Sequence, residues 1–177
     1  KAENKKEELK SNSPAAISLK KTNFIVPNSR VIYNDFEMEL TFNLSEQTKL
    51  SGDLLLQGTS GIINIKADNS QLEGGALISG SAKAHLTLEN NSIWTLTKRK
   101  SSSKVKNEQK AEQEQDNDSA KSLISTVTLK NSKIIFEKPI STSNVYQTLS
   151  IGTGSGVVYK AEDNSELHLN TYLDQNS

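Results

Sequence analysis

Two histidines, His85 and His168, are the residues of this 177-residue chain best suited to acid–base chemistry. Each lies beside leucines that alternate with polar residues, so in a strand the imidazole would point towards solvent. Serine is abundant, but no G-x-S-x-G elbow occurs and no third residue is placed to orient a base. The absence of cysteine excludes a thiol nucleophile, disulfide bonds and Cys-ligated zinc. We therefore expect no catalytic residues and no enzyme.

Carboxylates do not gather in the sequence. A calcium-dependent polysaccharide lyase would need clustered acids with a basic residue on one face, whereas Asp53, Asp68 and Glu73 are spread apart. The run GTGSG at 152–156 lacks the lysine of a phosphate loop, and EGGA at 73–76 lacks the aspartates of calcium-binding repeats. We read both runs as turns and expect no metal and no cofactor.

Charge is segregated in one polar segment. Residues 107–118 carry five carboxylates against one lysine. The basic half before them has no acid and carries Lys98, Arg99, Lys100, Lys104 and Lys106. Such a run suits contact with a host cell-surface protein receptor or a sulfated glycosaminoglycan. The alternative is a solvated, protease-sensitive linker whose halves neutralise each other.

The composition predicts one folded domain that is preceded and interrupted by polar segments. Lys and Arg total 21, as do Asp and Glu, so no global field favours nucleic acid or a membrane surface. Hydrophobic residues make up only 33%, and the deficit is concentrated in two polar stretches. We expect a disordered charged lead-in at 1–13 and a folded domain at 14–177 that contains a disordered charged loop insertion at 98–122.

Alternating apolar and polar residues predict an all-β fold. The period of two recurs in short stretches at 17–19, 38–44, 63–65, 86–88, 127–129 and 167–169. Many of these stretches precede a corner rich in Asn and Ser, which tolerates left-handed backbone angles and bonds nearby peptide groups.

The unit of strand, corner and strand repeats along the chain. The starts at 17, 38, 63 and 86 are 21, 25 and 23 residues apart, which matches one coil of a β-solenoid. HLTLENNSIWTLT at 85–97 and TVTLKNSKIIFEK at 126–138 are near copies, so we expect successive rungs separated by an extruded loop. An antiparallel sandwich also fits short alternating strands.

In the solenoid the apolar members of the two copies would point inward and stack. The expected core residues are Leu86, Leu88, Trp94, Leu96, Val127, Leu129, Ile134 and Phe136.

An ordered series of motifs resembles the C-terminal part of a passenger domain from bacterial autotransporters, the pertactin-like proteins of type V secretion. The series covers about half of the chain. It consists of SIWTLT at 92–97, STVTLKNSKIIF at 125–136, YQTLSI at 146–151, GSG at 154–156 and LHLNTYLD at 167–174.

The resemblance implies a right-handed parallel β-helix, exported through the periplasm and the outer membrane by its own translocator barrel, which is absent from these residues. It places Trp94, Leu129, Phe136, Tyr146 and Leu149 at core-packing positions. Two departures from the family pattern are the long charged insertion after the Trp94 strand and an end at Ser177, before the final strands. We expect a processed or truncated passenger at the bacterial surface or secreted.

From the resemblance we expect a virulence factor that binds a host receptor, such as a mimic of a proangiogenic growth factor, and acts as a monomer or with weak self-association. Three alternatives stay open: a self-associating adhesin, a β-helical carbohydrate-active enzyme, and a folding and export scaffold for an upstream effector.

Overall fold

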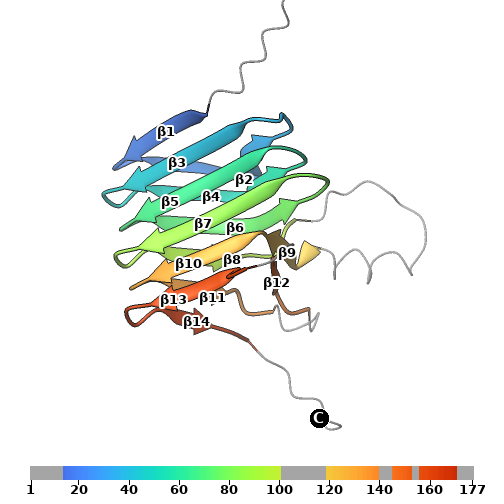
Figure 1. Cartoon of the computed structure of the whole chain (residues 1–177). Coiled ribbons are helices and arrows are strands. Elements are labelled where there is room, and N and C mark those ends of the chain that lie inside the picture. Colours follow the sequence, from blue (N-terminus) through green and yellow to red (C-terminus); the bar gives the residue numbers. More distant parts are fainter. Residues whose placement is uncertain (1–13, 101–118, 140–144, 153–155, 171–177) are drawn as a thin grey trace, which may run out of the picture.

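In the computed structural model the chain is all-β and built from stacked parallel strands (Figure 1). The structure describes residues 14–100, 119–139, 145–152 and 156–170, and the expected lead-in at 1–13 lies outside them. Every pairing between strands of the described residues is parallel. An antiparallel sandwich is therefore excluded for this part of the chain.

The first sheet has six strands, which Figure 1 shows stacked in chain order from blue to red. They are β1 (Ala15–Lys20), β3 (Glu39–Ser45), β5 (Ile62–Asp68), β7 (Lys83–Glu89), β10 (Thr126–Lys130) and β13 (Tyr159–Glu162).

The second sheet takes the strands that follow them. Its strands are β2 (Asn23–Asn34), β4 (Lys49–Gly58), β6 (Gln71–Ile78), β8 (Ile93–Leu96), β11 (Lys133–Phe136) and β14 (Glu166–His168). A third sheet pairs β9 (Lys121–Ile124) with β12 (Thr148–Ile151). We call each pair of successive strands from the first two sheets a layer, so that β1 and β2 form the first layer and β13 and β14 the sixth.

The two repeated stretches are neighbours in both sheets. Leu86 and Leu88 pair with Val127 and Leu129, although 41 residues separate each pair. In the second sheet Trp94 pairs with Ile134, and Leu96 pairs with Phe136. The charged segment is therefore inserted in the sequence between two layers that are adjacent in the structure.

The core is a column of apolar side chains that runs through the layers. Seven of the expected core residues are buried: Leu86, Leu88, Trp94, Leu96, Val127, Leu129 and Ile134. Phe136, Tyr146 and Leu149 are half-buried. Trp94 also satisfies its buried indole N–H, which donates to the carbonyl of Gly74 at 3.0 Å.

Corners between the two sheets use left-handed residues followed by a Ser or Thr. Asn69, Asn91 and Asn131 have positive φ angles, which Asn tolerates better than most residues. The next residue turns its hydroxyl inward: Ser92 Oγ accepts the N–H of Ser70 in the preceding layer at 3.0 Å and donates to the carbonyl of Glu89 at 2.7 Å. These bonds satisfy buried polar groups where the ladders are interrupted.

A second corner lies within the long strands β2 and β4. Their pairing shifts between Val26 and Arg30, and again after Ser51, so each strand bends into two faces. After β8 the chain leaves this corner and returns as β9, whose Ser122 Oγ accepts the N–H of Ala76 in β6 at 3.1 Å. Strand β9 thus takes the last two residues of the expected 98–122 insertion.

We expect Leu129→Asp to destabilise the fold by more than about 3 kcal/mol, because Leu129 is fully buried between Leu88 and Ala161 and the carboxylate would have no partner. Thr128→Asp is the matched control, since Thr128 points to the opposite side of the same strand. Chemical denaturation of both variants tests the assignment. Equal stability of the two would contradict it.

At the corner, Asn131→Val should cost roughly 1–2 kcal/mol because a β-branched residue is strained at the φ of 47°. Asn131→Gly should stay within about 1 kcal/mol of the parent, since glycine adopts this angle freely. Thermal unfolding ranks the two variants, and a Val variant as stable as the Gly variant would argue against a strained corner.

Candidate binding site

The start of the charged segment is fixed against the second sheet. The backbone N–H of Lys98 donates to the Glu137 carboxylate at 3.0 Å, and that of Lys100 donates to the Asp53 carboxylate at 2.6 Å. The Lys100 ammonium donates to Pro27 O and Asn28 Oδ1, both at 2.8 Å. Of the five expected contact residues, Lys104 and Lys106 lie outside the described part of the chain.

These contacts show that residues 98–100 run across the strands. Glu137 directly follows β11 in the fifth layer, Asp53 belongs to β4 in the second, and Asn28 belongs to β2 in the first. Residues 98–100 therefore follow the bent-strand corner along the stacking direction. Lys98 and Arg99 make further interactions of their own.

Arg30 lies at the same corner and was not found from the sequence. It follows the irregular part of β2, two residues after Asn28, and its side chain is exposed. Its Nη1 donates to Gln57 Oε1 at 2.7 Å, and its guanidinium carbon lies 4.1 Å from the centroid of the Tyr33 ring. The sequence does not single out this arginine, because its position at the corner depends on how β2 bends.

We call Arg30, Lys98, Arg99 and Lys100 the basic corner. Two carboxylates, Asp53 and Glu137, accept backbone N–H groups from it. The field of such a group of charges is local and acts within about one Debye length, roughly 8–10 Å.

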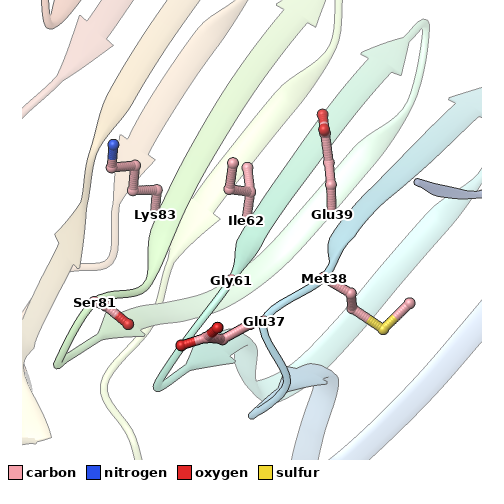
Figure 2. Close-up of a pocket in the computed structure, with 7 residues that line it drawn as sticks. All are labelled: Glu37, Met38, Glu39, Gly61, Ile62, Ser81 and Lys83. Atoms are coloured by element: carbon pink, nitrogen blue, oxygen red, sulfur yellow. The ribbon is translucent and has the colours of Figure 1, made fainter. Parts of the chain in front are cut away.

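A shallow hollow of about 360 Å³ opens where β3, β5 and β7 begin. Figure 2 shows Glu39, Ile62 and Lys83 side by side on these strands. The other lining residues are Glu37, Met38, Gly61 and Ser81. Glu39 accepts a hydrogen bond from Asn64 at 2.7 Å. The hollow thus offers mixed charge and two apolar side chains, Met38 and Ile62.

His85 borders this region on the outer side of β7. It is half-buried, and its Nδ1 lies 2.7 Å from Thr126 Oγ1 in the next layer. Burial lowers the pKa of His85, Lys83 lowers it further, and Glu39 opposes both effects. His168 is exposed in the other sheet, where it bonds to Glu166 and lowers the pKa of that carboxyl. The two histidines therefore share no site.

A second hollow of about 460 Å³ crosses the Asn corners of the first four layers. It is lined by Asn23, Gln47, Lys49, Asn69, Ser70, Gln71 and Asn91. Its Lys49 ammonium lies 3.4 Å from the Glu73 carboxylate. The hollow is therefore rich in neutral amides.

The three carboxylates considered for calcium are held apart by different partners. Asp53 accepts from Lys100, Asp68 accepts from Asn90 at 2.8 Å, and Glu73 pairs with Lys49. In the part of the chain that the structure describes, no group of three or more His, Cys, Asp or Glu side chains is placed to hold a metal ion.

No protein-family model, curated protein or solved structure matches the chain. Across the described residues, no helix has the length and apolar character needed to cross a membrane.

The lowered pKa of His85 predicts a loss of stability in acid. As the pH falls, His85 is protonated near pH 6.5 in the unfolded chain but only at a lower pH in the folded chain. The stability that the neutral His85 imidazole contributes is therefore complete above about pH 6.5 and is lost as the pH falls through the folded pKa. We expect His85→Gln to show a smaller fall in Tm than the parent between about pH 7 and pH 5. His168→Gln is the control for loss of an exposed imidazole, and equal slopes for parent and His85→Gln would contradict the prediction.

Proposed function

We propose that the chain is a right-handed parallel β-helix from a secreted autotransporter passenger and that it binds a host cell surface without catalysis. Successive strands alternate between two sheets and pair in parallel with strands of the next layer, which supports a helical path of the chain. Right-handedness is favoured because crossovers between parallel strands are right-handed in about 98% of cases. The motif series at 92–97 and 125–136 supports the passenger assignment.

Export is part of this proposal. An autotransporter passenger crosses the periplasm and then the outer membrane through its own translocator barrel, and it acts at the bacterial surface or after release. A chain without cysteine suits this route, because it forms no disulfide bonds in an oxidising compartment.

The basic corner is the observation that carries the binding proposal. Three acceptors on two neighbouring strands hold Lys100: Asp53, Pro27 and Asn28. Cations fixed on a layered scaffold lose less entropy on binding than cations on a free tail. The partner is a host cell-surface protein receptor or a sulfated glycosaminoglycan, and receptor binding includes mimicry of a growth factor.

Self-association is the second candidate function. Ile17 and Phe24 in the first layer pair with Phe42 and Leu50 and point to the core side, yet they are 42% and 46% exposed. Leu167 in the sixth layer pairs with Ile134 in the fifth layer and is 43% exposed. Apolar strand edges of this kind favour pairing with other chains. Analytical ultracentrifugation at micromolar concentration separates the candidates, because a monomer disfavours the adhesin.

Binding of the 177-residue chain to host cells tests the proposal. We expect replacement of Lys98, Arg99 and Lys100 by Gln to reduce binding about tenfold or more, since each cation contributes to the local field. The control replaces Lys66, Lys130 and Lys133 by Gln and removes the same charge elsewhere. Flow cytometry with both folded variants gives the comparison. If the two variants bind alike, the basic corner is not the contact surface.

A further inference from the structure

We infer that the second hollow, which crosses the Asn corners of the first four layers, binds a neutral oligosaccharide through side-chain amides. We call this surface the amide hollow. Its volume is about 460 Å³, and the amides that line it are Asn23, Gln47, Asn69, Gln71 and Asn91. The inference goes beyond the proposed function, because it adds a second surface and does not depend on the basic corner.

One column of the amide hollow lies on the second sheet. Asn23, Lys49 and Gln71 are register partners on β2, β4 and β6. Each directly precedes or follows residues of the same strands that alternate in direction, so the three side chains share one side of the sheet. Because neighbouring strands are about 4.8 Å apart, this column presents polar side chains at a regular step.

The other column lies at the corners of the second, third and fourth layers. Gln47, Asn69 and Asn91 all have positive φ angles there. The N–H of Gln47 donates to the carbonyl of Asn69 at 2.8 Å, and the N–H of Asn91 donates to the carbonyl of Asn131 at 2.7 Å. These bonds link the corner backbones from layer to layer, so the column is in place before a ligand binds.

The side chains of the amide hollow have unused hydrogen-bonding capacity. Within the described part of the chain, the five amides donate and accept no side-chain hydrogen bond. By contrast, Asn64 and Asn90 donate to the carboxylates of Glu39 and Asp68. A side-chain amide offers two N–H donors and a carbonyl with two lone pairs. A hydroxyl group is both donor and acceptor, so a ligand rich in hydroxyls matches such amides.

The charge of the lining favours a neutral ligand. Lys49 pairs with the Glu73 carboxylate at 3.4 Å, which offsets its charge. The described residues that line the hollow include no aromatic side chain to stack on a nucleobase and no apolar side chain to anchor a peptide. An oligosaccharide needs neither a charge nor an apolar anchor to form hydrogen bonds with these amides.

The shape of the amide hollow favours a linear ligand. It extends from Asn23 in the first layer to Asn91 in the fourth. Three strand intervals of about 4.8 Å give a length of roughly 14 Å along the stacking direction. An oligosaccharide that lies along the two columns can therefore contact amides of several layers at once.

Nuclear magnetic resonance of the ¹⁵N-labelled 177-residue chain tests the inference directly, because side-chain NH₂ groups give their own signals. The probes are four neutral pentasaccharides: cellopentaose, maltopentaose, mannopentaose and chitopentaose. We expect at least one of them to shift the NH₂ signals of Asn23 and Gln71 saturably, with a Kd of about 1 mM, because each hydrogen bond gains little over its bond to water. Unshifted NH₂ signals with all four probes would overturn the inference.

Variants locate the contact on the strand column. Gln71→Ala and Asn23→Ala should each raise the Kd about three- to tenfold, since each removes the amide of an exposed residue. Asn43→Ala is the matched control, because it removes an amide from β3 in the other sheet. Thermal unfolding of each variant establishes that the fold persists. An equal change in Kd for Asn43→Ala and Gln71→Ala would contradict the assignment.

The basic corner provides the second comparison. Replacement of Lys98, Arg99 and Lys100 by Gln should leave the Kd for the pentasaccharide unchanged, even if it reduces binding to cells. A rise in Kd equal to that of Gln71→Ala would place the saccharide elsewhere and overturn the inference. Failure of the proposed function is therefore distinguishable, because it appears in binding to cells and not in the NH₂ signals.

Discussion

Each layer of this protein can bury its apolar side chains only against the layers beside it, and the parallel register decides whether it does so. Leu88 lies between Ala67 and Leu129, and all three are buried. Because side chains alternate along a strand, a slip of one residue would turn a whole row of apolar groups outward. The burial of the column therefore fixes the register, and the register fixes every other position in the fold.

This constraint determines where the chain tolerates additional residues. An insertion within β7 or β10 would break the register, whereas one at a corner leaves the stacked strands intact. The charged segment occupies such a corner, between β8 and β9, at the position where β2 and β4 bend. Its first residues then bond to those bent strands. The same geometry that accommodates the insertion thus gathers cations into the surface that we propose as the binding site.

Much of the fold follows from local pattern. Alternation in 86–88 and 127–129 identified strands and inward residues, and the Asn and Ser positions identified the corners. The bends were not predictable in this way, because Leu54, Leu55 and Leu56 are all buried and hide the period of two. Strand β9 was also missed, since its four residues adjoin the polar segment and its place depends on β6.

The candidate site was less predictable than the fold. Charge density alone singled out Lys98 and Lys100, but it assigned both to a free loop, whereas their backbone N–H groups donate to Glu137 and Asp53. Arg30 belongs to the same corner only because β2 bends there. Contacts of this range depend on register and on bends, neither of which a single sequence displays.

Pulsed electron paramagnetic resonance between two spin labels tests the stacking most directly. Ser18 and Lys160 belong to one outward column, linked by successive pairings through Asn43, Lys66, Thr87 and Thr128. The chain has no cysteine, so Ser18→Cys with Lys160→Cys gives two unique labelling sites. Five strand intervals predict a narrow distance distribution centred near about 24 Å. A broad distribution, or a centre far from that distance, would contradict the stacked arrangement.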